Sequence, residues 1–237
     1  MPTESLTISQ LEQYLSKAAW ILKGPIGASD FKAYIFPMLF FKRISDVYDE
    51  EYQTALDESG GDEEYAALPE FHRFVIPDGC HWNDVRETTS NIGLEIESCL
   101  REIESANQEH LYGIFGDAQW SNKEKLPDRL LTDLVEHFSQ YTLSTALVAR
   151  DMLGQAYEYL IKHFADLTNK KAGEFYTPRS VVHLMGLIID PHEGESIYDP
   201  ACGTGGMLIE CIDHLKAAGE DFRTLNLYGQ EKNLTSS

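Results

Sequence analysis

Apolar residues recur at helical spacing through about the first 165 residues of the chain. The run from Leu11 to Leu22 follows this spacing, and Thr7 with Gln10 precedes it in the arrangement of a capping box. A second helix is predicted over residues 31–52, which carry a heavy apolar load typical of a packed core helix. Pro37 lies inside this segment and is expected to kink or split the helix, because proline removes a backbone donor.

Three more helices are predicted in this part of the chain. Apolar residues at spacings of three and four mark Ile92–Ile103 and Pro127–Phe138, and a further helix is expected over about Thr145–Ala165. The short polar segment 167–175, LTNKKAGEF, contains glycine and is interpreted as a boundary between domains. We therefore expect a helical N-terminal domain over residues 1–168 and a second domain over 169–237.

The hydrophobic pattern changes after this boundary. Pro178 is suited to begin a helix that reaches Ile189, and a short strand is predicted at Ser196–Tyr198. A helix over Gly206–Ala218 and a strand over Leu225–Gly229 complete a strand–helix–strand unit, which implies a parallel sheet. A parallel sheet is normally covered on both faces, and two strands with one helix between them do not achieve this. We therefore expect a mostly α domain followed by the opening βαβ part of an α/β domain.

Composition adds a strongly acidic surface to this picture. The net charge is -20, and ten acidic residues without a basic one lie between Asp46 and Glu70. Such a surface as a whole disfavours DNA, whose affinity for proteins comes mainly from Lys and Arg; the stretch Arg150–Arg179, where basic residues slightly outnumber acidic ones, is the local exception. The four cysteines form no CxxC pair, and no apolar run approaches the roughly 18 residues of a membrane span, so we expect a cytoplasmic protein with free thiols.

The segment DPACGTGG, residues 199–206, follows the first predicted strand and has the character of a ligand-binding loop. A phosphate-binding P-loop requires lysine after its last glycine, but Met207 stands there. The dinucleotide fingerprint requires glycine at position 208, which is Leu208. What remains is an acid, Asp199, followed by glycines that allow close approach of a ligand to the backbone, and this combination suits a cationic ligand such as S-adenosylmethionine.

A second acid supports this hypothesis. Glu231 follows the second predicted strand, 26 residues beyond Gly205, where a carboxylate is placed to accept both hydroxyls of an adenosine ribose. The alternative is that Asp199 caps the following helix, a common and stabilising role for aspartate. The glycines and Glu231 together favour the ligand.

The same residues carry a family resemblance. DPACGTGG resembles the S-adenosylmethionine motif of DNA adenine-N6 methyltransferases, and GEFYTPRSVV, residues 173–182, resembles its companion motif. With DFKAYIFPMLFFKRISD and LGQAYEYLI upstream, the chain is similar over essentially its whole length to the N-terminal portion of the modification subunit of type I restriction–modification enzymes. The resemblance implies a class I, Rossmann-like methyltransferase domain.

The resemblance also implies roles for particular residues. Asp199 and the backbone of Gly203 and Gly205 would lie beside the methionine part of the cofactor, and Pro200 and Cys202 of the same motif would also belong to the cofactor-binding residues. Thr177 would bind the methionine carboxylate, Phe175 and Tyr176 would shape the adenosine side, and Glu231 would take the ribose hydroxyls. The alternative for the companion motif is an aromatic turn in which Thr177 caps the following helix, a role compatible with binding.

The partners implied by the resemblance are a specificity subunit, a second methylase subunit, a nuclease subunit, and double-stranded DNA in the assembled complex. Sequence recognition would belong to the specificity subunit, so the acidic surface of this chain need not supply the main contacts to phosphates. The helical domain would dock on the specificity subunit and close over the DNA.

The catalytic motif of the family, Asn-Pro-Pro-Phe/Tyr, does not occur in these 237 residues. That motif holds a flipped adenine by its exocyclic amine. We therefore assign no catalytic or metal-binding residue and expect this polypeptide not to methylate DNA by itself. Two alternatives stay open: a non-catalytic protein that docks on other subunits, and a class I methyltransferase that acts on cytosine N4, RNA or a glutamine side chain.

Overall fold

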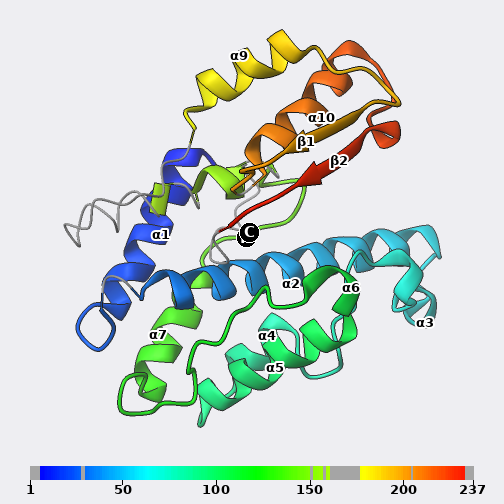
Figure 1. Ribbon diagram of the computed structural model, residues 1–237. Coiled ribbons are helices and arrows are strands. Elements are labelled where there is room, and N and C mark those ends of the chain that lie inside the picture. Colours follow the sequence, from blue (N-terminus) through cyan, green and yellow to red (C-terminus); the bar gives the residue numbers. More distant parts are fainter. Residues whose placement is uncertain are drawn as a thin grey trace. The chain divides into compact units, whose positions relative to one another are not determined.

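The computed structural model describes residues 6–27, 30–149, 152–156, 159–160, 177–203 and 205–232 (Figure 1). The described residues fall into two compact units. Unit 1 comprises those up to residue 149 together with 159–160, and unit 2 comprises 152–156 and those from 177 onward. The expected domain boundary at 167–175 lies outside the described residues.

The helices and the 3-10 turn of unit 1 are connected by turns and loops in its described part. Its elements are α1 (Ile8–Leu22), α2 (Lys32–Glu58), α3 (Glu63–Ala66), the 3-10 turn η1 (Pro69–Phe71), α4 (Trp82–Glu87), α5 (Ile92–Ala106), α6 (Gln108–Leu111) and α7 (Asp128–Phe138). The helices predicted from apolar spacing are confirmed as α1, α2, α5 and α7, whereas the shorter α3, α4 and α6 were not predicted. None of the helices in the described ranges has the length and apolar character that a membrane crossing requires.

Helices α1 and α7 of unit 1 are joined by a reciprocal pair of hydrogen bonds. The hydroxyl of Tyr14 on α1 donates to the carbonyl of Phe138 on α7 at 2.6 Å, and the Nε2 of His137 lies 2.8 Å from the carbonyl of Tyr14. All three residues are buried, so these bonds satisfy polar groups that water does not reach. The capping box predicted at Thr7 and Gln10 is present and begins α1.

Helix α2 continues through Pro37, so the predicted split does not occur, while a kink at this position stays a prediction. Pro37 is the sixth residue of a 27-residue helix, and the backbone bond that it cannot make would have reached the carbonyl of Ala33 in the first turn. The loss of one bond near the helix start is small beside the burial of Ile35, Met38 and Phe41, which are inaccessible to solvent. Packing therefore overrides the local preference.

The buried polar side of α2 holds the segment 143–146. Arg43 donates to the carbonyls of Leu143 and Ser144, and the backbone N–H of Leu143 donates to Asp46 at 2.6 Å. Glu50 accepts the N–H groups of residues 145 and 146 at 2.9 and 3.0 Å. These bonds fix residues 143–146 on α2. Residues 145–147 form a turn, whereas residues 152–156 and 159–160 are helical, so the helix predicted over Thr145–Ala165 is confirmed in its later described part and not at its start.

Unit 2 contains a strand–helix–strand unit preceded by a helix. Its elements are α9 (Arg179–Ile189), β1 (Ser196–Asp199), α10 (Gly206–Ala218), the 3-10 turn η2 (Phe222–Thr224) and β2 (Asn226–Gly229). The strands pair in parallel, with Ser196 opposite Asn226 and Asp199 opposite Gly229, which confirms the predicted parallel sheet. Cys211 and Leu215 of α10 pack with Leu225 against the inner face of the two strands.

Helices α9 and α10 run in the same direction. His183 contacts Glu210 at 2.6 Å near their beginnings, and Asp190 contacts His214 at 2.9 Å near their ends. The helix of a βαβ unit runs opposite to its strands, so the first residues of α9 and α10 and the last residues of β1 and β2 lie at the same end of unit 2 (Figure 1). The glycine-rich loop lies at this end.

Candidate cofactor-binding site

The glycine loop connects β1 to α10, and two of its glycines adopt a left-handed backbone. Gly203 has φ of 52° and Gly205 has φ of 78°, a region that disfavours side chains with a Cβ. A Cβ built on either residue would meet no heavy atom of the described residues outside the chain neighbours within 4 Å, so these residues leave the space before both glycines open. The loop therefore presents bare backbone that a ligand can approach closely.

Asp199 ends β1 and is half-buried at the base of the loop. Its Oδ1 accepts the backbone N–H of Ala201 at 3.0 Å, which shapes the first turn of the loop. The N-cap of α10 is instead Gly205, which supplies no side chain to cap the helix. Asp199 is thus not the cap of α10, and the alternative raised from the sequence does not describe its position.

Glu231 is brought to the same loop by the end of β2. Its Oε2 accepts the backbone N–H of Gly203 at 2.9 Å. Beside it, the N–H of Gln230 donates to the carbonyl of Asp199 at 2.8 Å, and the N–H of Cys202 donates to the carbonyl of Gln230 at 2.9 Å. The two carboxylates that the sequence singled out therefore belong to one network around one loop, although 31 residues stand between them in the chain.

Gly229 is a residue of this network that the sequence analysis did not single out. A Cβ at this position would lie 2.8 Å from the sulfur of Cys202 and 3.3 Å from the Cδ1 of Leu208. The loop and the start of α10 therefore pack directly on the backbone of β2. The available signal was a glycine at the end of an apolar strand, which often marks a close backbone approach.

The companion motif is described in part. Thr177 is half-buried and Pro178 is exposed just before α9, whereas Phe175 and Tyr176 lie outside the described residues. Pro178 occupies the N-cap position of α9 without a side-chain hydrogen bond, so Thr177 does not cap this helix as the alternative for the motif assumed. Because α9 and α10 run in the same direction, Thr177 lies at the end of unit 2 that carries the loop (Figure 1).

The charges around the loop suit a zwitterionic group. The N-terminus of α10 directs backbone N–H groups and the positive end of its dipole toward the loop, which favours an anion. The carboxylate of Asp199 lies beside it and favours a cation.

Burial raises the pKa of the nearby Cys211 thiol, and this cysteine packs in the core instead of facing the loop.

In sequence order, the chain has a helical unit followed by a parallel strand–loop–helix–strand unit. Comparison with known proteins identifies its family. Residues 148–237 match the family N-6 DNA Methylase, a class of DNA methyltransferases. Residues 11–138 match the HsdM N-terminal domain, more than half of the chain. The chain therefore belongs to the family of methylase subunits of type I restriction–modification enzymes.

Relatives with assigned names agree with this family. The type I restriction enzyme MjaVIII methylase subunit of Methanocaldococcus jannaschii is 32% identical over 97% of this chain and 39% of its own length. The MjaIX methylase subunit of the same organism is 25% identical over 94% of this chain and 42% of its own. A solved type I restriction-modification system methyltransferase subunit from Streptococcus thermophilus superposes with a TM-score of 0.73 at 27% identity, covering 97% of this chain and 54% of that one. The chain thus spans about half the length of the solved subunit and about two fifths of the two curated relatives.

Proposed function

We propose that unit 2 binds S-adenosylmethionine on the loop from Asp199 to Gly205, as the cofactor-binding part of a DNA adenine-N6 methyltransferase. The observation that carries this proposal is the convergence of Asp199 and Glu231 on one loop with two left-handed glycines. Family membership supports the reaction class.

The residues present fit the cofactor, because the open space before Gly203 and Gly205 leaves room for a ligand in contact with backbone. Asp199 would hold the ammonium of the methionine part, and the N-terminus of α10, with Thr177 at the same end, would hold its carboxylate. Glu231 would accept the ribose hydroxyls, with Phe175 and Tyr176 on the adenosine side. Pro200 and Cys202 would shape the glycine loop, and the side chain of Cys202 packs against the backbone of Gly229. The bound cofactor supplies the sulfonium methyl group that is transferred to adenine N6.

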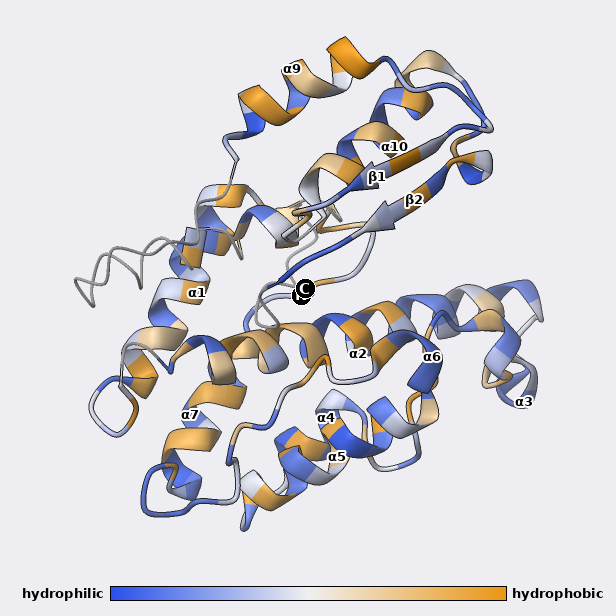
Figure 2. Ribbon diagram, in the orientation of Figure 1, coloured by the Kyte–Doolittle hydropathy of each residue, from blue (hydrophilic) through white to orange (hydrophobic). Residues whose placement is uncertain are grey.

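The βαβ unit is, in this proposal, the opening part of a Rossmann-like methyltransferase domain. The parallel pairing of β1 and β2 supports it. So does the sheet face opposite α10, where Tyr198 and Tyr228 are each 57% exposed, because parallel sheets normally have both faces covered. Figure 2 shows α9 as mostly apolar, and Leu184 and Ile188 on it are 54% and 72% exposed. Further elements of the domain would cover these surfaces.

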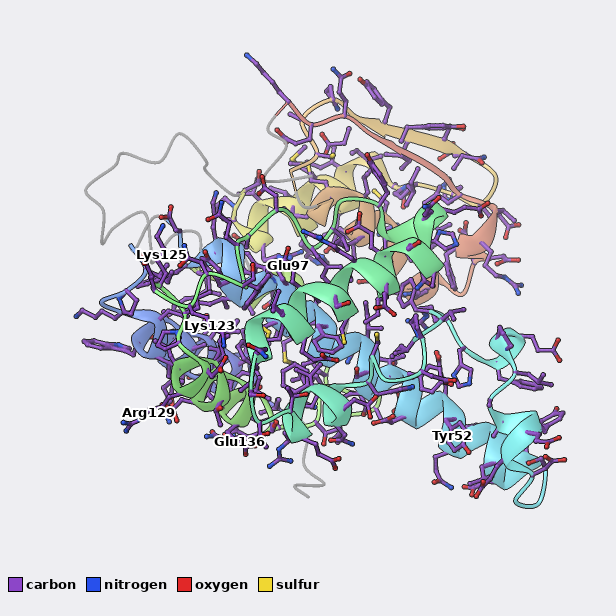
Figure 3. All side chains as sticks on the ribbon, turned by 90° about the horizontal axis from the view of Figure 1, so that it is seen from below. Tyr52, Glu97, Lys123, Lys125, Arg129 and Glu136 are labelled. Carbon is purple, nitrogen blue, oxygen red and sulfur yellow. The ribbon has the colours of Figure 1, made fainter. Side chains whose placement is uncertain are left out.

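Unit 1 is proposed to be the part that docks on other subunits of a type I complex and closes over DNA, with a domain boundary near residue 168. The partners would be a specificity subunit, a second methylase subunit and a nuclease subunit. On this otherwise acidic unit, Lys123, Lys125 and Arg129 project from the loop before α7 and from its first turn (Figure 3). Lys123 pairs with Asp128 at 3.3 Å, while Lys125 and Arg129 are exposed cations suited to a phosphate backbone.

The cofactor proposal is tested by calorimetric titration of the 237-residue chain with S-adenosylmethionine and with its demethylated product, S-adenosylhomocysteine. We expect binding by the natural chain and a loss of about tenfold to a hundredfold in Asp199→Ala, which removes a charge-assisted contact. Asp213→Ala is the matched control, because Asp213 is an exposed carboxylate on α10 that pairs with Lys216 away from the loop.

The competing function is a non-catalytic docking protein that keeps the fold of unit 2 without using its loop. An absence of heat up to sub-millimolar ligand would favour this function, and so would equal affinities of the natural chain and Asp199→Ala. The acceptor also remains open between adenine N6 and other substrates of class I methyltransferases, namely cytosine N4, RNA and a glutamine side chain. A transfer assay on the assembled complex with each labelled substrate decides among them.

A further inference from the structure

The hydrogen bond between Gly203 and Glu231 connects the middle of the glycine loop to the segment after β2. The backbone N–H of Gly203 donates to the Oε2 of Glu231 at 2.9 Å, across 28 positions of sequence. The proposed function has Glu231 bind the ribose hydroxyls, and that role does not require a bond to Gly203. The bond therefore points to a second role for the same carboxylate.

Three bonds between described residues connect the loop to this segment. Two of them join backbone to backbone, from Gln230 to Asp199 and from Cys202 to Gln230. The third is the bond from Gly203 to Glu231, and it depends on a side chain. The first two hold the base of the loop, whereas the third reaches the residue that has φ of 52° and faces open space. The orientation of the peptide group between Cys202 and Gly203 therefore depends on Glu231.

We propose that Glu231 is a positioning residue for the glycine loop, which fixes this peptide group in the conformation that receives the ligand. A carboxylate acceptor makes a stronger bond to a backbone N–H than a neutral one, so the loop is held in place before any ligand arrives. The consequence for ligand affinity rests on the proposed function. The consequence for the loop itself does not.

The loop is tested first without ligand, by amide hydrogen exchange at Gly203. Cys202–Gly203 is the one Cys–Gly pair in the sequence, so labelling with carbonyl-¹³C cysteine and ¹⁵N-glycine isolates its amide in an NMR spectrum. We expect exchange in Glu231→Ala to be about tenfold to a hundredfold faster than in the natural chain. Glu231→Gln keeps a side-chain oxygen as acceptor and is expected to stay within a few-fold of the natural chain.

Glu195→Ala is the matched control for this measurement. Glu195 lies in the same unit and also accepts a backbone N–H, that of His192 at 2.9 Å, but it stands before β1 and away from the loop. Its removal is expected to leave Gly203 exchange unchanged. The proposal is overturned if Glu231→Ala leaves Gly203 exchange unchanged, or if Glu195→Ala accelerates it equally.

Ligand binding then separates positioning from direct contact. S-adenosylhomocysteine is compared with its 2′,3′-dideoxy analogue, which lacks the hydroxyls that Glu231 would bind. We expect Glu231→Ala to weaken both ligands, and Glu231→Gln to weaken mainly the ligand with hydroxyls. Equal affinity of the dideoxy analogue for the natural chain and Glu231→Ala would contradict the effect of positioning on affinity. If the natural chain binds neither ligand, the proposed function fails, while Gly203 exchange still decides the positioning role.

Discussion

The sulfur of Cys202 lies 2.8 Å from the point where a Cβ of residue 229 would stand, so the glycine loop rests directly on the backbone of β2. Real side chains essentially never approach a Cβ so closely. The contact joins the loop after the first strand to the last residue of the second. It makes Gly229 part of the candidate site although its side chain is a single hydrogen.

Gly229→Ala is therefore expected to displace the loop. The added methyl group must push away Cys202, at a cost of about 1–3 kcal/mol in unfolding free energy, and should weaken S-adenosylhomocysteine binding about tenfold. Calorimetric titration measures the affinity. Cys202→Ala combined with Gly229→Ala removes the closest contact and should restore part of the loss, whereas Asn226→Ala on the same strand is the control and should change neither quantity. Wild-type affinity in Gly229→Ala would contradict the role of this contact.

The helices of unit 1 were predictable because they carry their own signal. Helices α1, α5 and α7 each present an apolar stripe at helical spacing, and Thr7 with Gln10 marks the start of α1. The attachment of residues 145 and 146 to α2 was not predictable, since their N–H groups donate to Glu50, 95 and 96 positions away. Local pattern finds elements that bury one face, and misses segments held by a distant side chain.

The candidate site likewise has a part that local sequence predicts and a part that it does not. Asp199, Gly203 and Gly205 were found because a ligand loop requires these residue types close together in the sequence. The bond from Gly203 to Glu231 and the approach of Cys202 to Gly229 depend on the parallel register of β1 and β2. Register brings together residues that are far apart along the chain, and no local spacing encodes it.

Asp46 is expected to be among the most sensitive polar positions of unit 1. It is buried on α2, pairs with the equally buried Lys42 and accepts the N–H of Leu143. Asp46→Ala leaves a buried ammonium and a buried N–H without this acceptor, so we expect a loss of about 3–5 kcal/mol in unfolding free energy. All three tryptophans lie in unit 1, so urea unfolding followed by tryptophan fluorescence reports on this unit.

A double variant distinguishes the broken pair from a general defect of the helix. Burial raises the pKa of Asp46 in spite of the lysine beside it, which indicates that desolvation of the carboxylate outweighs its pairing. Lys42→Met with Asp46→Asn removes both charges and keeps an oxygen for Leu143, so it should lie within about 1 kcal/mol of the natural chain. Asp57→Ala, at an exposed position of α2, is the control. A loss in the double variant as large as in Asp46→Ala would refute the explanation.

His137 should make unit 1 less stable in acid. Burial lowers the pKa of this imidazole below its ordinary value of about 6.5, and the carbonyl of Tyr14 opposes that shift. A group with a lowered folded pKa contributes stability above its unfolded pKa, and this contribution is lost as the pH falls through the folded value. Unfolding midpoints from tryptophan fluorescence should therefore decrease below about pH 6.5. His137→Gln should flatten this part of the curve and the exposed His110→Gln should not; equal curves for both variants would count against His137.

His192 should act with the opposite sign in unit 2. The carboxylate of Glu220 accepts a hydrogen bond from the Nδ1 of His192 at 3.1 Å, and this bond and the negative charge of Glu220 raise the pKa of His192, with smaller contributions from Asp190 and Glu195. A group with a raised folded pKa contributes stability that is fully present below its unfolded pKa, about 6.5, and is lost as the pH rises through the folded value.

An NMR titration of the histidine ring protons should place the midpoint of His192 above about 6.5. Glu220→Gln should lower that midpoint, because it removes the negative charge that stabilises the imidazolium. Asp213→Asn, which neutralises an exposed carboxylate of the same unit, should leave it in place, and an unchanged midpoint in Glu220→Gln would show that the pair does not control the titration.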